Sequence, residues 1–292
     1  KPVMLIPLEH FGSHHAMYRI YAPSVQQLRQ SFHLVACIRA KDLDTTARAL
    51  FDDLIPIPDG LVALRELVES INELAPDVIW YPSVGMATWW TCLSAVRLAP
   101  IQLMSLGHPA TTMSEAMDYV LTEQETVGDP ALFSERIVYL PPGALQYAAR
   151  IDQTPISAET KLLLHEKHEE RIEETGVVRV VITSALMKLS LPFLESLKRI
   201  REKVSEVSMS YEVEYHFFPN TVGLWHWQAH KILREWFPTC VLHRRSDYPT
   251  YIARLADCDL HLSSFPFGGT NSNIDSLWVG LPIITLTGDE VH

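Results

Sequence analysis

The chain has 292 residues, of which 47% are hydrophobic and 20% charged, and its 24 Lys and Arg against 35 Asp and Glu give a formal net charge of −11 at pH 7. This composition is typical of a globular protein with a large core and argues against intrinsic disorder. The acidic balance argues against binding nucleic acid through phosphate neutralisation, which needs a basic surface. The length favours two domains, at about 150 residues for each.

Short runs of β-branched and apolar residues alternate with helical stretches, a pattern typical of parallel sheets with crossover helices. In the first half the expected strands are Val3–Pro7, His33–Ile38, Leu54–Ile57, Asp77–Tyr81, Ile101–Ser105, Tyr119–Thr122 and Arg136–Leu140. The clearest helix of this half, Leu61–Leu74, has a regular apolar face and is stopped by Pro76.

The second half repeats this alternation. Its expected strands are Val177–Thr183, Tyr211–Phe218, Cys240–His243, Asp259–Ser263 and Pro282–Leu286. Its expected helices are Leu191–Val207, Leu224–Phe237, Tyr248–Ala256 and Asn271–Val279. Between the halves lies a polar helix with Ser157 as its N-cap and Gly176 as its end.

We therefore predict two doubly wound α/β domains, residues 1–156 and 177–292, joined by a linker helix over residues 157–176. In such folds ligands bind at the carboxyl ends of the strands, so the expected site is a cleft between the domains. The chain does not begin with Met and ends just after a strand-like run. We therefore expect a piece of a longer protein.

No segment has the pattern of an export signal or a membrane span. The most apolar window, Gly85–Met104, contains Arg97 and Pro100 and lacks the ~20 clean apolar residues that a span needs. The chain has four cysteines without a C-x-x-C spacing: Cys37, Cys92, Cys240 and Cys258. We interpret them as small buried residues of a protein in a reducing compartment, and we expect a cytoplasmic location.

The sharpest motif, Phe265-Pro-Phe-Gly-Gly-Thr-Asn-Ser-Asn-Ile-Asp275, follows an expected strand and opens an expected helix. Its two glycines allow a tight turn and a close approach of the backbone to a ligand. Thr270, Asn271 and Ser272 then offer polar groups and backbone N–H donors at a helix N-terminus, which suits phosphate. Asp275 lies one turn further, where it can accept hydrogen bonds from sugar hydroxyls. The same residues also fit a Gly-rich turn with a helix cap, so the pattern leaves both interpretations open.

Three histidines follow the first expected strand within six residues: His10, His14 and His15. A cluster of this kind indicates general bases, groups that hold a polar substrate, or metal ligands. A metal site needs Cys or carboxylate partners, and Glu9 is the one nearby carboxylate in this stretch. We favour contact with a polar substrate, with surface histidines of no role as the alternative.

Lys188 lies where the strand Val177–Thr183 is expected to give way to a loop. A lone lysine is most often a solvated surface charge. At the end of the first strand of the second domain, however, it is placed to neutralise a diphosphate leaving group without a metal. As a residue of an exposed loop, it is expected to contribute little to the stability of the fold.

The two D-x-D pairs are not predicted to bind metal. Asp42-Leu-Asp44 precedes two threonines and a helix, so we interpret it as a helix cap. Asp257-Cys-Asp259 straddles a helix end and a strand start, which points the two carboxylates apart. G-x-S-x-G, H-E-x-x-H and Walker patterns do not occur in the sequence.

Three ordered stretches together resemble one family. Ala99–Thr112 with Met117–Glu125 is similar to the central motif of glycosyltransferase family 41, which includes the O-GlcNAc transferases and the bacterial cytoplasmic N-glycosyltransferases of high-molecular-weight adhesins. Ala256–Asp275 with Trp278–Pro282 is similar to the nucleotide-sugar motif of the family, and His10–His15 matches its amino-terminal histidine motif in position. Phe-Pro-Phe-Gly followed by Thr-Asn resembles the adhesin enzymes more than the O-GlcNAc transferases.

The resemblance implies a GT-B fold, in which two Rossmann-like domains face a cleft and the second holds most of the UDP-sugar. It implies this set of UDP-sugar-binding residues: Lys188, Asn220, His243, Arg245, Gly269, Thr270, Asn271, Ser272 and Asp275. It places Lys188 against the diphosphate and Asp275 on the ribose. As catalytic residues it implies His10, Lys188 and either His14 or His15, because the alignment is ambiguous by one residue. As the cleft wall it implies Gly107, His108 and Pro109.

The sequence departs from the family pattern in two respects. Arg245 stands in the uracil-binding segment Val241–Ser246 where the adhesin enzymes are expected to have a histidine. The family also carries helical sequence ahead of the catalytic part and further sequence behind it, so the second domain is expected to be truncated.

The resemblance predicts an inverting enzyme that moves a hexose from UDP-hexose to protein side chains, at Asn in Asn-x-Ser/Thr sequons, without a metal or other cofactor. Its expected partners are the UDP-sugar and an acceptor protein such as an adhesin. One alternative is transfer of GlcNAc to Ser or Thr, and another is a non-catalytic module that binds nucleotide or peptide. A sugar-nucleotide epimerase is less favoured, because Asp275 is better placed for the ribose than for the sugar.

Overall fold

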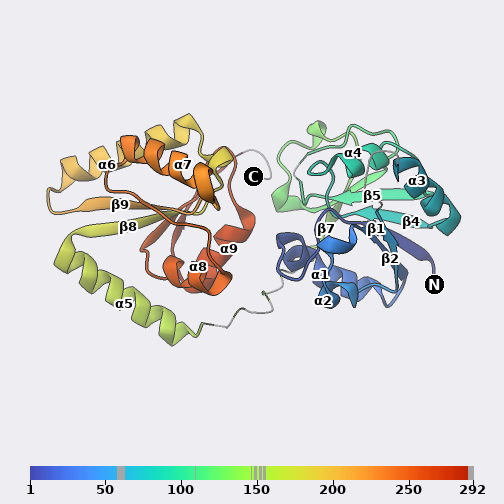
Figure 1. Cartoon of the computed structure of the whole chain (residues 1–292), viewed down its shortest axis with the longest axis horizontal. Coiled ribbons are helices and arrows are strands. Elements are labelled where there is room, and N and C mark those ends of the chain that lie inside the picture. Colours follow the sequence, from blue (N-terminus) through green and yellow to red (C-terminus); the bar gives the residue numbers. More distant parts are fainter. Residues whose placement is uncertain are drawn as a thin grey trace. The chain divides into compact units, whose positions relative to one another are not determined.

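A computed structural model describes residues 1–57, 63–108, 110–145, 147, 150, 153 and 156–288 (Figure 1). The chain forms two compact units, residues 1–151 and residues 152–288. The predicted domain boundary lies slightly later, at residue 156, and Ile156 packs against a core cluster of the second unit. Within the described ranges, the helices are too short or too polar to cross a membrane.

The first unit is built on a parallel sheet, which in the described part of the chain has seven strands in the order β3-β2-β1-β4-β5-β6-β7. The strands are β1 (Val3–Pro7), β2 (His33–Ile38), β3 (Asp53–Pro56), β4 (Val78–Tyr81), β5 (Ile101–Ser105), β6 (Tyr119–Glu123) and β7 (Arg136–Leu140). The register of the β1–β2 pair runs from Val3 opposite His33 to Pro7 opposite Cys37. The near-continuous apolar run of β1 is typical of a central parallel strand, which is buried on both faces.

Helices cover both faces of this sheet (Figure 1). One face carries α1 (Ala16–Leu28) and α2 (Thr45–Arg48), and the other carries α3 (Ala63–Leu74) and α4 (Thr88–Ser94). Short 3-10 turns lie at Ala40–Asp42, Gln124–Thr126 and Pro130–Leu132. Leu5 packs into the core under α3 and α4, whereas Ile6 packs into the core under α1.

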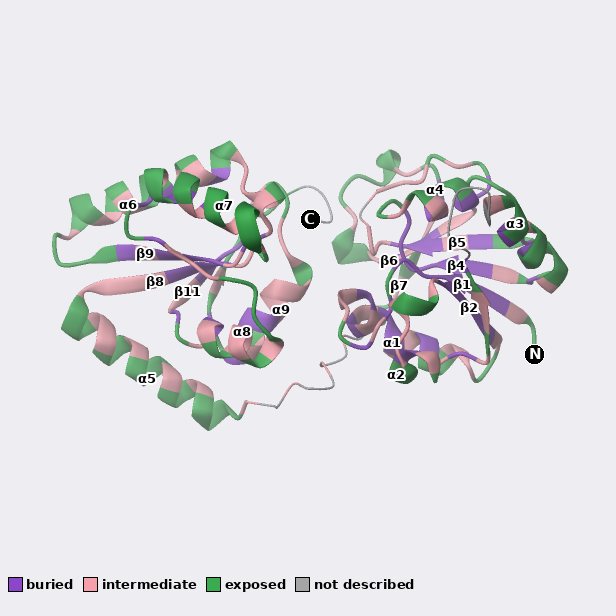
Figure 2. Ribbon diagram, in the orientation of Figure 1, coloured by how far each residue is buried: buried purple, intermediate pink, exposed green. Residues whose placement is uncertain are grey.

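The second unit repeats the design with a described sheet of five parallel strands in the order β10-β9-β8-β11-β12. The strands are β8 (Val177–Ile182), β9 (Glu212–Phe217), β10 (Val241–Leu242), β11 (Leu260–Leu262) and β12 (Ile283–Ile284). The helices are α5 (Ala158–Thr175), α6 (Leu191–Val207), α7 (Gly223–Trp236), α8 (Tyr248–Leu255) and α9 (Thr270–Val279), with a 3-10 turn at Leu186–Lys188. Figure 2 shows the buried positions concentrated along the strands and the exposed ones on the outer sides of the helices.

The predicted linker helix forms as expected but belongs structurally to the second unit. The Ser157 side chain accepts a hydrogen bond from Thr160 N, and Gly176 ends the helix at a φ of 66°. Arg171 of this helix holds the carboxylate of Asp259, which precedes β11, with contacts of 2.5 Å to each oxygen. Helix α5 is therefore docked on the sheet of the second unit through a largely buried ion pair, in which the side chains of Arg171 and Asp259 are 20% and 7% exposed.

The structure corrects several details of the sequence prediction. The edge strands β10 and β12 are shorter than Cys240–His243 and Pro282–Leu286, because an edge strand has a hydrogen-bonding neighbour on one side only. The predicted start of the helix Leu61–Leu74 lies outside the described residues. Of the four cysteines, Cys37, Cys240 and Cys258 are buried, but Cys92 is exposed on α4.

Candidate functional site

The histidine motif, Lys188 and the Gly-rich motif all lie where the strand order of a sheet reverses. In open α/β sheets, ligands bind outside the carboxyl ends of the strands at such points. The reversal falls between β1 and β4 in the first unit and between β8 and β11 in the second. The histidine motif follows β1, Lys188 follows β8, and the Gly-rich motif follows β11. Each unit thus presents its polar motif where its topology places a ligand site.

In the second unit, the loops after β8 and β11 are fastened together by side chains. Lys188 Nζ donates to the Gly268 carbonyl at 2.6 Å and lies 4.4 Å from the ring centre of Phe267. Ser184 Oγ donates to Ser264 Oγ at 2.6 Å, and Ser190 Oγ donates to the Phe265 carbonyl at 2.9 Å. Burial lowers the pKa of Lys188. Lys188 is therefore half-buried, which corrects the expectation of a lysine in an exposed loop.

The Gly-rich loop leads directly into α9, whose N-cap is Gly269. A Cβ atom on Gly269 would lie 2.3 Å from Ser272 Oγ, so a larger residue here would displace the Ser272 hydroxyl from its hydrogen bond to the Gly269 carbonyl. Thr270, Asn271 and Ser272 form the first turn, where backbone N–H groups lack intrahelical acceptors and the helix dipole favours an anion. With the Lys188 ammonium fastened to the preceding loop, the site combines a cation and a helix N-terminus, as a diphosphate requires.

Asp275 lies one turn further along α9 and is buried, with 5% of its surface exposed. It accepts a hydrogen bond of 2.8 Å from the hydroxyl of Tyr248, the first residue of α8. The sequence did not single out Tyr248, because its partner lies 27 positions away on another helix. In the structure, Asp275 is thus held by the start of α8 and ties that helix to the motif.

The remaining predicted UDP-sugar residues lie on loops at the same edge of the sheet. Asn220 follows β9 and is exposed, with a left-handed φ of 55°. His243 follows β10 and stacks on Phe218, with ring centres 4.1 Å apart and an angle of 12° between the planes. Arg245 is exposed two residues further on. Burial, then the nearby His216 and Arg254, lowers the pKa of His243 to about 4.

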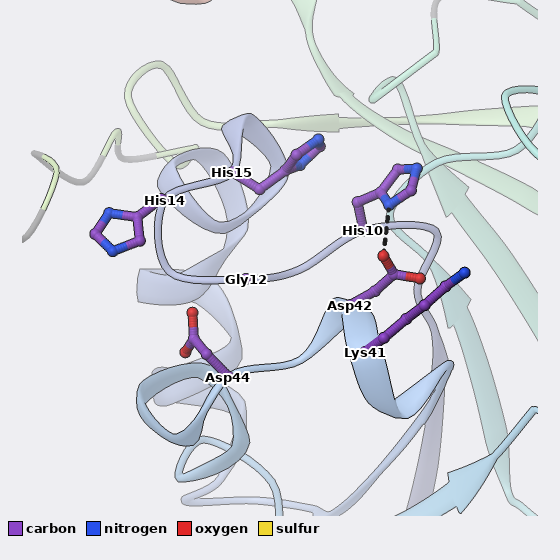
Figure 3. Close-up of a pocket in the computed structure, with 7 residues that line it drawn as sticks. All are labelled: His10, Gly12, His14, His15, Lys41, Asp42 and Asp44. Atoms are coloured by element: carbon purple, nitrogen blue, oxygen red, sulfur yellow. Dashed lines mark hydrogen bonds and ion pairs between the residues drawn. The ribbon is translucent and has the colours of Figure 1, made fainter. Parts of the chain in front are cut away.

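In the first unit, the histidine motif lines a cavity of about 340 Å³ (Figure 3). Its lining residues are His10, Gly12, His14, His15, Lys41, Asp42 and Asp44. The ring centres of His10 and His15 lie 5.1 Å apart, whereas the ring of His14 is turned the other way in Figure 3. Arg150 Nη2 lies 3.2 Å from His14 Nδ1. The geometry therefore groups His15, rather than His14, with His10.

The hydrogen bonds of His10 and His15 give their rings different chemical roles. His10 Nδ1 lies 3.3 Å from Asp42 Oδ1, and because a carboxylate accepts, Nδ1–H donates, which leaves the lone pair of the neutral ring on Nε2. His15 caps α1, with Nδ1 accepting from Met17 N at 3.2 Å, so its neutral ring carries the proton on Nε2. Burial, then His10, lowers the pKa of His15, which favours that neutral ring. His10 can accept a proton, and His15 can donate a hydrogen bond.

The predicted cleft-wall residues follow β5. A Cβ atom on Gly107 would lie 2.6 Å from the Pro82 carbonyl oxygen, so glycine is needed where the loops after β4 and β5 touch. The ring of His108 lies against Gly85, and its buried Nδ1 makes no hydrogen bond within the described structure. Pro109 lies outside the described residues. Because the loop after β4 lies so close to it, Gly107 acts as a packing residue of the fold.

Two buried carboxylates, Glu9 and Glu135, hold loops of the first unit in place. This role was not predicted from the sequence. Glu9 accepts from Ser83 Oγ at 2.8 Å and from Ala87 N at 2.6 Å, which fastens the loop after β1 to the loop after β4. Glu135 accepts from the hydroxyls of Thr111 and Thr112. Burial raises the pKa of Glu135, but these hydrogen bonds outweigh it and lower the pKa overall. The signal for this role in the sequence is an acidic residue next to the end of an apolar strand, as Glu9 is after β1 and Glu135 is before β7.

The D-x-D residues act within the fold. Asp44 caps α2 by accepting from Ala47 N at 2.9 Å, which confirms the interpretation as a cap, and it also accepts from Ser13 N and Oγ. Asp257 pairs with Arg179 at 2.7 Å, whereas Asp259 pairs with Arg171. In the part of the chain that the structure describes, no three His, Cys, Asp or Glu side chains are grouped as a metal would need.

Comparisons with known proteins agree with these motifs. Residues 91–216 match Glycosyl transferase family 41. Two UDP-glucose:protein N-beta-glucosyltransferases of Actinobacillus pleuropneumoniae, from serotype 5b (strain L20) and serotype 7 (strain AP76), are 34% and 35% identical to this chain over its whole length. This chain belongs to glycosyltransferase family 41. It spans 45% of the length of each of these relatives.

A solved structure supports the fold of this family 41 chain. A mutant O-GlcNAc transferase from Thermobaculum terrenum superposes with a TM-score of 0.71 at 18% identity, covering 100% of this chain and 54% of that one. At this identity the match bears on the fold alone. The fold is of the α/β GT-B class, made of two Rossmann-like units, and the resemblance seen in the sequence is confirmed.

Proposed function

We propose that this chain is the catalytic part of an enzyme that transfers a hexose from UDP-hexose to Asn side chains of a protein, in Asn-x-Ser/Thr sequons. The observation that carries the proposal is the Lys188 ammonium fastened to the Gly-rich loop at the N-terminus of α9. The relatives that match the whole chain act on UDP-glucose and protein, as their names state, which supports glucose as the sugar.

The donor site stabilises the departing diphosphate through the protein alone. Lys188 spends one N–H on the Gly268 carbonyl, so further ammonium hydrogens are available for phosphate oxygens. The first turn of α9 adds oriented N–H groups, and such preorganised donors stabilise charge that develops in the transition state. We propose on this basis that transfer needs no metal ion or other cofactor, and from the family resemblance that it inverts the sugar.

On the acceptor side, the first unit offers a proton acceptor and a hydrogen-bond donor. His10, oriented by Asp42, presents Nε2 as a general base, and His15 presents Nε2–H to hold a polar oxygen. We propose that these residues line the site of the acceptor protein, for which an adhesin is the candidate that the family resemblance implies. The buried thiols of Cys37, Cys240 and Cys258 suit action in the reducing cytoplasm.

Isothermal titration of this chain with UDP, with and without Mg²⁺, tests the donor site. We expect micromolar affinity that is the same in both conditions, because the protein supplies the positive charge. Affinity that appears only with Mg²⁺, or transfer that is lost in EDTA, would overturn the metal-free part. No binding of UDP at all would overturn the donor site.

The acceptor is tested with peptides that differ at one side chain. Each peptide carries either Asn-Ala-Thr or Gln-Ala-Thr in the same flanking sequence, and each is incubated with UDP-glucose, UDP-galactose or UDP-GlcNAc. We expect glucose to be added to the Asn peptide, with a mass increase located on Asn by fragmentation. Addition to Thr in both peptides, above all from UDP-GlcNAc, would instead identify a Ser/Thr enzyme.

A further inference from the structure

Three side chains form a continuous row from β9 to the residue after β10. Glu214 Oε1 lies 2.8 Å from His216 Nε2, and His216 Nδ1 lies 2.9 Å from His243 Nε2. His216 is 7% exposed and uses both ring nitrogens within the row. Arg179 Nε, on the neighbouring strand β8, lies 3.7 Å from the same Glu214 oxygen. The proposed function assigns no role to Glu214 or His216.

When the His216 ring is neutral, the hydrogen bonds of the row set the tautomers of both histidines. The Glu214 carboxylate can only accept, so His216 carries a proton on Nε2. In a neutral His216 ring, Nδ1 then has a lone pair and accepts from His243 Nε2–H. His243 is itself neutral at pH 7, because burial, then His216 and Arg254, holds its pKa near 4. Its remaining lone pair therefore lies on Nδ1.

The Nδ1 atom of His243 remains available to a ligand. The described structure gives this atom no hydrogen bond. The atom is also not fully buried, so a ligand can reach it. Phe218 covers one face of the ring at 4.1 Å, while His216 holds its Nε2 edge. These contacts fix the plane and the rotation of the His243 ring. Nδ1, a hydrogen-bond acceptor in this tautomer, is the one ring nitrogen that the described contacts leave unused.

We propose that Glu214 and His216 are positioning residues that hold His243 in the Nε2–H tautomer, so that Nδ1 accepts a hydrogen bond from a ring N–H of the donor's nucleobase. This inference rests on the proposed use of a UDP-sugar. Uracil has an N–H at ring position 3, where cytosine has a lone pair. The row therefore favours a uridine over a cytidine nucleotide, although Glu214 and His216 do not touch the ligand.

The tautomer is tested without any ligand, by two-bond ¹H–¹⁵N correlation spectra of the histidine rings. We expect the wild-type His243 ring to show the pattern of a neutral Nε2–H imidazole. Glu214→Gln keeps the size of the side chain but can donate to His216 Nε2, so a signal of the Nδ1–H form should appear at His243. Glu212→Gln is the matched control, because it removes an exposed charge from the same strand outside the row. A wild-type ring already in the Nδ1–H form, or one that Glu214→Gln leaves unchanged, would overturn the proposal.

The ligand is tested by titrating UDP and CDP into the same three proteins. We expect wild type and Glu212→Gln to prefer UDP, and Glu214→Gln to lose about fivefold to tenfold of that preference through weaker UDP binding, the effect of one hydrogen bond. An equal fall in UDP and CDP affinity would show a merely structural role and would overturn the positioning role. If wild type binds neither nucleotide, the proposed function fails and takes the nucleobase contact with it. The ligand-free spectra then still decide the tautomer.

Discussion

Lys188 makes contacts within its own protein and, in the proposed function, also binds the donor. Its ammonium group is half-buried between the Gly268 carbonyl and the Phe267 ring, and burial lowers its pKa. A partly desolvated cation interacts more strongly with an incoming anion than a solvated one, because less water screens the charge. At the same time its contacts fix the Gly-rich loop, so catalytic and structural effects of its replacement have to be separated.

We predict that Lys188→Met reduces turnover by about 100-fold or more, the usual effect of removing one preorganised donor to a developing charge. The free energy of unfolding should fall by about 1 kcal/mol, because one hydrogen bond and one cation–π contact are lost while the chain of methylenes is kept. Initial rates of transfer and urea unfolding measure the two effects. Lys231→Met, which removes an exposed cation on α7, serves as the control. Equal rates for Lys188→Met and wild type would refute the role of Lys188.

At the residue scale, the sequence predicted where the candidate residues lie in the fold better than which groups they contact. It placed Lys188 on a loop after a strand and Asp275 one turn into a helix, but their partners Gly268 and Tyr248 lie 80 and 27 positions away. It also left His14 and His15 as equal choices, because local spacing does not show which way a ring turns. Pairings of this kind arise from the strand order, which brings distant loops together.

At the element scale, α5 shows how one ion pair joins a charged helix to a sheet. Arg171 contacts both oxygens of Asp259 and also donates to the Val177 carbonyl at 2.9 Å. Asp259 accepts in addition from Arg179 N at 2.7 Å and lies 3.5 Å from His168 Nδ1. The Asp259 side chain is 7% exposed, so these partners take the place of water around its carboxylate. The helix predicted as a linker is therefore a component of the second unit.

Replacing Arg171 by Met should destabilise the second unit by about 3–5 kcal/mol, because a buried carboxylate is left without its main partner. Urea unfolding followed by circular dichroism measures the change. Lys167→Met, at an exposed position of the same helix, should change stability by less than about 0.5 kcal/mol. A loss of similar size in both variants would show that helix propensity, and not the ion pair, is responsible.

Helices and strands were predicted best where the local sequence pattern is regular. Apolar runs such as Val3–Pro7 and His33–Ile38 were predicted with the bounds that the structure has, because a central parallel strand is buried on both faces. Helix α1 was not predicted. It contains Pro23 in its interior and begins at a histidine cap, His15, so it lacks the usual start signal.

At the scale of the whole molecule, the two units share one topology but differ in their buried histidines. In each sheet the first strand of the unit lies between the second strand on one side and a later strand on the other, so that the strand order reverses beside it. Each unit also has core clusters of its own. In the second unit, burial lowers the pKa of His261 to about 4, and the pKa of His243 is lowered to the same value. In the first unit, burial lowers the pKa of His15 as well, but that side chain is only partly buried, whereas His261 is 1% exposed. We therefore expect the units to respond differently to acid.

The second unit should lose stability before the first as the pH falls from 7 to 5. An unfolded histidine takes up a proton near pH 6.5, whereas folded His261 resists protonation until about pH 4. The unfolded state therefore binds more protons in this window, and the stability that is fully present above pH 6.5 declines as the pH falls. For His261, which is 1% exposed, the loss by pH 5 is on the order of 1–2 kcal/mol. In the first unit, the pKa values of Asp118 and Glu135 are lowered, so their stabilising contributions are lost mainly as the pH falls through and below their ordinary range, near 4.

Hydrogen exchange resolved by peptide distinguishes the two units, because opening free energies of β1 and β2 report on the first and those of β8 and β9 on the second. Between pH 7 and pH 5, after correction for intrinsic exchange, β8 and β9 should lose more opening free energy than β1 and β2. His261→Gln removes the titrating ring but keeps an amide that can bond Thr183 Oγ1, the partner of His261 Nε2 at 3.0 Å. This variant should be less stable at pH 7 but should lose less between pH 7 and pH 5. A uniform loss across both sheets, or the same loss with and without His261, would show that the acid sensitivity has another source.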